Sequence, residues 1–270
     1  MSGISASVIA ARAVEFVQCS TLLRNPFLAY GFLRSGRSPE VAGFRVGPLQ
    51  FQARKQDWCV IREVVVLDEY ACIDRLLAGQ DAPKVLDLGA NIGCFALRVL
   101  SRFPRAAVVS VEAAQDTFTV LQENRNLNPA SDWTVLNYGV WGDDKPLTIQ
   151  RRGLAMAHRV IEGEGLESVR GISLASLVQS LGWQRVDLIK IDIEGGEESV
   201  VPAAIDVLRA TSALVIEVHT DRIDAGKVMD ALRAVFRHAW QVNDRSSSKP
   251  VYVLSHAPLD LDGIGVPVDL

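Results

Sequence analysis

The chain contains little cysteine and no paired cysteine motif. Its four cysteines, Cys19, Cys59, Cys72 and Cys94, are far apart among 270 residues. None belongs to a C-x-x-C pair or matches the spacing of a zinc site. This excludes a disulfide framework and a cysteine-based zinc module as the basis of the fold. We interpret the cysteines as free thiols and expect a cytoplasmic protein.

Long apolar runs and clustered positive charge are also missing. No apolar run reaches the ~18 residues that a membrane-spanning helix needs, so we expect no membrane span. Arg12 and Glu15 interrupt the apolar stretch near the N-terminus, and no basic segment precedes it, which disfavours a signal peptide. The 28 basic and 32 acidic residues give a net charge of −4. We therefore expect no nucleic-acid partner, because binding to a phosphate backbone needs clustered positive charge.

The N-terminal part has a different pattern from the rest of the chain. Residues 1–80 are predicted to form an extension with amphipathic helices in 1–45, strands within 44–67 and a helix over 68–77. Packing of these helices on the main domain is the simplest interpretation, because an amphipathic segment needs a place to bury its apolar face. A substrate cap or a contact in a homo-oligomer is the alternative.

From residue 81 to 270 short apolar strands alternate with helices. The predicted strands are 84–88, 107–111, 133–138, 186–193 and 213–218, followed by a hairpin of 240–242 and 250–254. The predicted helices are 92–103, 116–128 (with Asp116 as its N-cap), 174–181 and 221–238. Alternation of this kind predicts an α/β fold with a mostly parallel, doubly wound sheet that ends in an antiparallel hairpin.

A glycine-containing turn follows the first of these strands. It reads Asp87-Leu88-Gly89-Ala90-Asn91-Ile92-Gly93 and leads into a helix, where backbone N–H groups can meet a ligand. A dinucleotide loop would need G-x-G-x-x-G, but Asn91 and Cys94 stand where the second and third glycines would be. An acid at the strand end suits a ligand that carries an ammonium group. The alternative is a tight turn without a ligand.

Glu112 ends the second strand, 25 residues after Asp87. A carboxylate at this position can accept both ribose hydroxyls of a nucleoside that lies across the sheet edge. Taken alone, such a glutamate would indicate only a solvated turn. An ammonium group at one end and a ribose at the other describe S-adenosylmethionine, so the combination with the glycine turn favours that ligand.

At this point the chain resembles the FkbM-type methyltransferases, a family of class I S-adenosylmethionine-dependent enzymes. The matching segments lie between residues 83 and 220: Val85-Leu86-Asp87-Leu88-Gly89-Ala90-Asn91-Ile92-Gly93, Val111-Glu112-Ala113, Leu121-Gln122-Glu123-Asn124 with Asn128, Val186-Asp187-Leu188-Ile189-Lys190-Ile191-Asp192-Ile193-Glu194-Gly195 with Glu197, and Ile216-Glu217-Val218-His219. The proline that the family usually has after the second-strand acid is replaced by Ala113-Ala114.

The resemblance implies a Rossmann-like class I methyltransferase fold. It also implies methyl transfer from S-adenosylmethionine to a small-molecule acceptor, most often a hydroxyl of a sugar or secondary metabolite. The residues expected to bind the cofactor are Asp87, Gly89, Ala90, Asn91, Gly93, Glu112, Ala113 and Asp192.

A group of titratable residues follows the fourth and fifth strands. Asp192 and Glu194 are spaced i, i+2, as are Glu217 and His219, so each pair shares a face if its strand continues. Separately, the acids could complement a helix N-terminus, and His219 could be structural. Together they favour a functional site. Mg²⁺ or Mn²⁺ is a possible ligand, with Asp192, Glu217 and His219 as candidates, but a metal is not favoured.

Methylation of an alcohol benefits from a group that accepts its proton. His219 is predicted to be this base, since the ordinary pKa of histidine near 6.5 suits the task. Asp192 is the competing base, and Glu194 is a further catalytic candidate. Lys190, inside an apolar strand, is expected to pair with a nearby carboxylate because an unpaired buried ammonium is costly.

Other interpretations remain open on the sequence alone. A catalytically inactive nucleoside-binding scaffold of the same fold is one, and turnover of any hydroxylated acceptor would exclude it. A dinucleotide oxidoreductase is another, which the missing glycines already disfavour. The polar segment 151–165, with His158 and Arg159, is either a solvated excursion or a lid that supplies cations to the acceptor.

Overall fold

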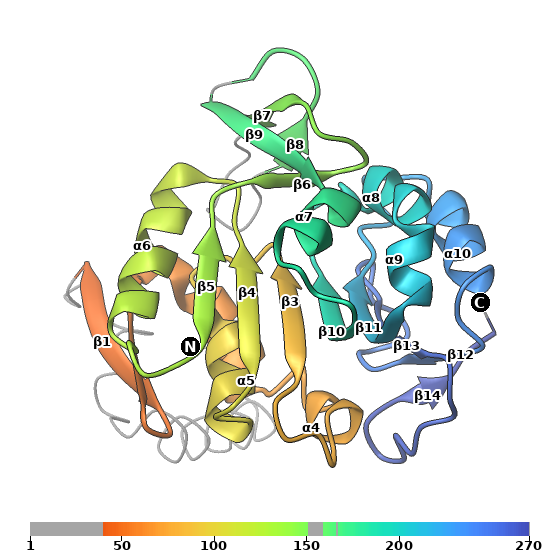
Figure 1. The fold of residues 1–270 in the computed structure, drawn as a ribbon, viewed down its shortest axis with the longest axis horizontal. Helices are drawn as coiled ribbons and strands as arrows, with labels where there is room; N and C mark the ends of the chain where they lie inside the picture. Colours follow the sequence, from red (N-terminus) through yellow and green to blue (C-terminus); the bar gives the residue numbers. More distant parts are fainter. Residues whose placement is uncertain (1–39, 151–158, 166, 270) are drawn as a thin grey trace, which may run out of the picture.

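A mixed eight-stranded sheet organises the chain in the computed structural model, which describes residues 40–150, 159–165 and 167–269 (Figure 1). In spatial order its strands are β14 (Val266–Pro267), β12 (His238–Gln241), β13 (Val251–Ser255), β11 (Thr211–Glu217), β10 (Val186–Ile191), β3 (Lys84–Leu88), β4 (Ala107–Val111) and β5 (Trp133–Leu136). The five strands from β11 to β5 are mutually parallel, whereas β13 is antiparallel to both β11 and β12.

The strand order reverses between β3 and β10. The chain enters the sheet at β3, moves outward through β4 to β5, and later returns to the other side of β3 with β10 and then β11. In doubly wound sheets, ligands bind at such a switch point, outside the carboxyl ends of the strands. The predicted α/β fold with a mostly parallel, doubly wound sheet is confirmed, and so is the antiparallel hairpin formed by β12 and β13.

Helices cover both faces of the sheet. One face is covered by α5 (Cys94–Arg102) and α6 (Gln115–Asn126), and the other by α7 (Leu174–Ser180), α8 (Glu197–Ala203), α9 (Ile205–Arg209) and α10 (Ala225–Arg233). Successive strand residues point to opposite faces, so Val85 and Leu188 belong to the first hydrophobic cluster, and Leu86 and Ile189 to the second. Burial on both faces explains why these strands are almost continuously apolar.

The described part of the N-terminal extension is more helical than predicted. It consists of the hairpin β1 (Val41–Val46) and β2 (Leu49–Arg54), a 3₁₀ turn (Lys55–Asp57), α3 (Trp58–Val60), a π-helix (Ile61–Val66) and α4 (Ile73–Leu76). The prediction of strands within 59–67 was therefore wrong, and the helix predicted to start at residue 68 begins at Ile73. Packing of the β-branched run against α5 outweighs its strand propensity.

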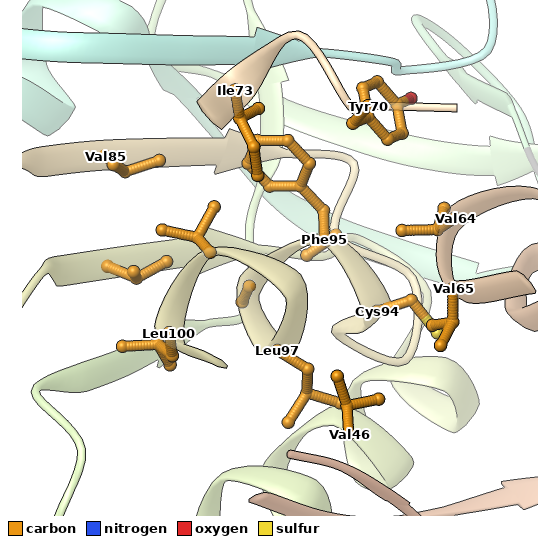
Figure 2. Packing of buried hydrophobic residues seen from close by; sticks show 14 of the residues in the cluster. Val46, Val64, Val65, Tyr70, Ile73, Val85, Cys94, Phe95, Leu97 and Leu100 are labelled. Atoms are coloured by element: carbon orange, nitrogen blue, oxygen red, sulfur yellow. The ribbon is translucent and has the colours of Figure 1, made fainter. Parts of the chain in front are cut away.

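The extension and α5 share one core, shown in Figure 2. Val64 and Val65 of the π-helix lie beside Cys94 at the start of α5. Tyr70 meets the ring of Phe95 edge-on, with centroids 5.1 Å apart and planes at 84°. Residues 41–77 are thus part of the same hydrophobic cluster as one face of the sheet. The domain boundary after residue 80 stays a prediction, and the helices predicted before residue 40 lie outside the described residues.

A small second sheet lies above the carboxyl ends of β3, β4 and β5 (Figure 1). Its strands, in spatial order, are β6 (Gly139–Trp141), β9 (Glu167–Ser173), β7 (Pro146–Gln150) and β8 (Arg159–Ile161). The sequence did not predict this sheet. Helix α6 begins with Ala114 as its N-cap, so the prediction of Asp116 there was wrong. Within the described residues, no helix is long and apolar enough to cross a lipid bilayer.

Candidate active site

A cavity of about 340 Å³ opens at the switch point between β3 and β10. Its floor comes from the loops that follow β3, β4 and β10, and its walls come from the π-helix, the small sheet and the loop of the β12–β13 hairpin. A volume near ~300 Å³ or above is typical of pockets that bind small molecules. The extension and the hairpin loop, which are far apart in sequence, therefore close the same site.

The loop after β3 passes very close to the end of β10. Gly89 has a φ of +77°, and a Cβ atom at this position would lie 1.7 Å from the carbonyl oxygen of Asp192. Only glycine fits there. Ala90 and Asn91, which were predicted to bind the cofactor, line the cavity together with Gly89. Gly93 does not line the cavity. It is the N-cap of α5 and has a φ of +92°, and a Cβ atom at this position would lie 2.6 Å from the ring of Trp133.

Glu112 lies at the cavity, next to Ala113. Its Oε2 accepts a hydrogen bond from the backbone N–H of Asn91 and its Oε1 accepts one from Ala114, both at 2.9 Å. These bonds fix the orientation of the carboxylate and leave a lone pair on each oxygen. Burial raises the pKa of Glu112 to about 7 despite the two backbone N–H donors, which lower it.

Asp87 lies beneath the loop and not in the cavity. Its side chain is fully buried, with Oδ1 3.4 Å from Nζ of Lys190, and Oδ2 accepts a hydrogen bond from Ser110 at 3.2 Å. Burial raises the pKa of Asp87, and Lys190 opposes this shift. The geometry therefore does not support direct contact between Asp87 and the ammonium group of a ligand bound in the cavity. The predicted pairing of Lys190 with a carboxylate is confirmed, and its Nζ also lies 3.5 Å from Asp192.

The segment after β10 brings two acids to the cavity. Asp192 and Glu194 both line it, and Glu194 has a φ of +56°, an uncommon conformation for a residue with a side chain. Gly195 follows with a φ of +104°. Glu194 forms an ion pair with Arg222, and Lys249 approaches its Oε1 to 3.8 Å.

His219 lies behind these acids and is fully buried. Its Nδ1 is 2.8 Å from Oε1 of Glu197, and its Nε2 faces carboxylate oxygens of Glu194 at 3.3 Å, Asp192 at 3.8 Å and Glu217 at 3.9 Å. Burial alone would lower the pKa of His219, but the surrounding carboxylates raise it to about 10. The ring is enclosed by these carboxylates and does not line the cavity, so a substrate hydroxyl held there cannot reach it. This position argues against His219 as the base.

The cavity is strongly acidic. Burial, followed by repulsion from Asp192, raises the pKa of Glu217 to about 8. Burial, followed by repulsion from Glu63, raises the pKa of Glu69 to about 7, and the pKa of Glu63 itself is raised mainly by burial. Lys190 and Lys249 are the cations among the described residues that line the cavity. The site is therefore suited to a ligand that carries positive charge.

Several of these residues were missed by the sequence analysis. They are Glu63, Glu69 and Tyr70 of the extension, Tyr138, Val140 and Val160 near the small sheet, and Asn243, Ser247, Ser248 and Lys249 of the hairpin loop. No motif marks them, because the cavity wall is assembled by tertiary packing. Of the polar segment 151–165, for which a solvated excursion and a lid were both open, Arg159 and Val160 lie in β8 and Val160 lines the cavity, whereas Arg151, Arg152 and His158 lie outside the described residues.

Comparison with known proteins identifies the family. The FkbM methyltransferase domain matches residues 87–241, which is more than half of the chain and includes the whole cavity floor. The chain belongs to the FkbM methyltransferase family. It is therefore a methyltransferase. This family membership rejects the alternative of a dinucleotide oxidoreductase, which the missing glycines had already disfavoured.

Two relatives of this FkbM-family methyltransferase are 27% and 28% identical to it over the aligned residues. It is 28% identical over 195 residues to the hexuronic acid methyltransferase AglP of Haloferax volcanii, a match that covers 71% of this chain and 78% of AglP. It is 27% identical over 167 residues to Methyltransferase 1 of Beauveria bassiana, covering 53% and 63% of the two chains. The N-terminal domain of EvdMO1 with SAH bound superposes with a TM-score of 0.46 at 13% identity, over 70% of this chain and 79% of that one.

Proposed function

We propose that the protein transfers a methyl group from S-adenosylmethionine to a hydroxyl of a small acceptor, a sugar or a secondary metabolite. The observation that carries this proposal is the pairing of the glycine loop with the fixed carboxylate of Glu112 at the switch point of the sheet. The loop leaves room for a ligand against the backbone, and the carboxylate offers two oxygens to a ribose.

The donor site would rest on Glu112 and on the loop at Gly89, Ala90 and Asn91. The two backbone N–H groups that hold Glu112 supply the preorganisation that ligand recognition needs. Asp87 would act indirectly: it compensates the charge of Lys190, which donates a hydrogen bond to the carbonyl oxygen of Gly89 at 2.8 Å. In this role Asp87 positions the loop and does not touch the cofactor.

For the acceptor step, alignment is the main contribution of the protein, because the sulfonium methyl group is already activated. The bond from sulfur to the methyl carbon breaks as the acceptor oxygen forms its bond to that carbon, and the hydroxyl proton passes to a base. We assign this base to Asp192, which lines the cavity and whose backbone contacts Gly89 of the donor loop. Its carboxylate is about a quarter exposed, whereas His219 is closed off from the cavity.

The loop of the β12–β13 hairpin favours a hydroxylated acceptor, because Asn243, Ser247 and Ser248 of this loop line the cavity with amide and hydroxyl groups. The relative named as a hexuronic acid methyltransferase supports the same substrate class.

Titration calorimetry with S-adenosylhomocysteine tests the donor site. We expect Glu112→Gln to lose ~1.5–3 kcal/mol of binding free energy, or about ten- to a hundred-fold in affinity, since a charged hydrogen-bond partner is removed. The matched control is Glu164→Gln, at an exposed position. Unchanged affinity in Glu112→Gln would remove Glu112 from the site.

Turnover tests the second half of the proposal. The protein is incubated with S-adenosylmethionine and a panel of glycosides, uronates and sugar nucleotides, and products are examined by mass spectrometry for one added methyl group. A methylated product with release of S-adenosylhomocysteine supports the assignment. Cofactor binding without turnover on any hydroxylated acceptor would favour the inactive scaffold.

A further inference from the structure

The two nitrogens of His219 have different environments. Nδ1 lies 2.8 Å from Oε1 of Glu197, and both side chains are fully buried. A histidine that ligates a metal almost always donates its other ring N–H to a carboxylate, which fixes the ring and aims the free nitrogen. The Glu197–His219 pair has this arrangement, and it directs Nε2 toward the acids at the back of the cavity.

Nε2 of His219 forms no hydrogen bond within the described residues. It faces three carboxylate oxygens, on Glu194 at 3.3 Å, Asp192 at 3.8 Å and Glu217 at 3.9 Å. A lone pair on Nε2 repels these carboxylate oxygens unless a positive charge lies directly between the nitrogen and the oxygens. The geometry therefore needs an occupant, which is either a proton on Nε2 or a cation.

The spacing of these atoms fits a cation. Nε2 of His219 lies 3.3 Å from an oxygen of Glu194 and 3.8 Å from one of Asp192, and one ligand atom from each of the three residues lies within 4.8 Å of the other two. Two ligands at ~2.1 Å from one ion are ~3.0–3.8 Å apart for ligand–ion–ligand angles from ~90° to ~130°. The backbone conformation of Glu194 also supports a functional site. Its positive φ costs free energy, and such strain is found mainly where it directs a side chain into a functional site.

We propose that Asp192, Glu194 and His219 bind a divalent cation, with Glu217 beside them. One imidazole together with carboxylates is a donor set that suits Mn²⁺. Arg222 and Lys249 approach the same acids from the solvent side, Arg222 at Glu194 and Lys249 at both Glu194 and Glu217. Both are long, partly exposed side chains, and we expect Arg222 to withdraw when the cation takes up the oxygen of Glu194.

The role of the cation rests on the proposed function, but its binding does not. A Lewis acid beside the donor loop would hold the acceptor hydroxyl and lower its pKa, so that the proton passes more easily, as the methyl group arrives, to the oxygen of Asp192 that does not bind the cation. The cation would also offset the negative charge that accumulates in this cavity.

Binding of Mn²⁺ to the full-length protein after EDTA treatment and buffer exchange tests the proposal. The loss of the free Mn²⁺ signal in electron paramagnetic resonance counts the bound ions. We expect one Mn²⁺ per chain in the wild type, loss of binding in His219→Gln, and binding weakened roughly 10- to 100-fold in Glu197→Gln, which keeps the shape of the side chain.

The matched control is His256→Gln. His256 also has an Nε2 without a hydrogen-bond partner among the described residues, but it follows β13 beside the amino end of β11, at the opposite end of that strand from Glu217, and it stacks on Phe236. This variant should bind Mn²⁺ like the wild type. If His219→Gln does not fold, as judged by circular dichroism, Glu197→Gln and Glu194→Gln decide the question.

Two results would overturn the proposal: no Mn²⁺ bound by the wild type at millimolar metal, or undiminished binding in the variants of His219, Glu197 and Glu194. The first result would mean that Nε2 carries a proton. Calorimetry with S-adenosylhomocysteine on the same EDTA-treated protein separates this failure from failure of the proposed function. Cofactor binding without Mn²⁺ binding rejects the metal alone, and Mn²⁺ binding without cofactor binding rejects the donor site alone.

Discussion

Nζ of Lys190 donates a hydrogen bond to the carbonyl oxygen of Gly89 at 2.8 Å and so ties the carboxyl end of β10 to the loop after β3, 101 positions earlier in the chain. The same ammonium lies 3.4 Å from Asp87 and 3.5 Å from Asp192. Burial lowers the pKa of Lys190, but Asp192 and Asp87 raise it above its ordinary value, so the group is charged. One buried cation therefore joins the floor of the donor loop to the proposed catalytic acid.

The first prediction concerns this cation. Lys190→Met leaves the carboxylate of Asp87 buried without its partner, and we expect a loss of ~3–5 kcal/mol in the free energy of unfolding. Urea denaturation followed by circular dichroism measures the loss. The double variant Asp87→Asn/Lys190→Met should be more stable than Lys190→Met, because the uncompensated charge is gone. Equal stability of Lys190→Met and the wild type would contradict the role of the pair.

The second prediction concerns the close approach of the donor loop to β10. Gly89→Ala puts a Cβ atom 1.7 Å from the carbonyl oxygen of Asp192, so the loop must move, and we expect cofactor binding to be lost. Gly163→Ala is the matched control, because Gly163 also has a positive φ, of +94°, but no neighbouring atom within 4 Å. Calorimetry with S-adenosylhomocysteine should give wild-type affinity for this control. Retained affinity in Gly89→Ala would show that the loop is not part of the donor site.

The third prediction is a pH dependence of donor binding. Burial raises the pKa of Glu112 to about 7, and ribose hydroxyls donate to the deprotonated form. Affinity for S-adenosylhomocysteine should therefore be constant well above pH 7 and fall below it, approaching about tenfold per pH unit. Calorimetry between pH 5.5 and 8.5 (roughly 1.5 units on each side) measures the curve. Glu112→Gln should bind weakly and lose this component, so an identical slope in the variant would assign the dependence to another group.

The parts of the molecule that could be predicted from sequence are those with local signals. Each central strand is a short apolar run bounded by turn residues, and the glycine loop and Glu112 lie at strand ends where chain order alone brings them together. The π-helix was mistaken for strands because its Val64-Val65-Val66 run has strand composition, and only its packing on α5 makes it helical. That error also concealed Glu63, which lies on the same π-helix and lines the cavity.

The role of His219 shows a different limit. Sequence spacing correctly brought His219 close to Asp192 and Glu217, but proximity does not determine protonation. The decisive partner is Glu197, which comes from the start of α8 and is fully buried against Nδ1. Only the three-dimensional arrangement reveals that the imidazole is enclosed by carboxylates and closed off from the acceptor.

The last prediction concerns Asp192, to which we assign the acceptor proton. Asp192→Asn keeps the size of the side chain and removes its basicity, and we expect kcat to fall by ~10²–10⁴-fold, the usual contribution of general base catalysis. Affinity for S-adenosylhomocysteine should change much less than in Glu112→Gln, because the acid faces the acceptor side of the donor loop. Asp187→Asn is the control, since Asp187 lies on β10, the strand that precedes Asp192, but accepts a hydrogen bond from the backbone of Lys84, at the opposite end of β10 from the cavity. Steady-state kinetics on an acceptor found by mass spectrometry give both constants. A kcat for Asp192→Asn within a few-fold of the wild type would transfer the role to Glu194 or Glu217, which also line the cavity.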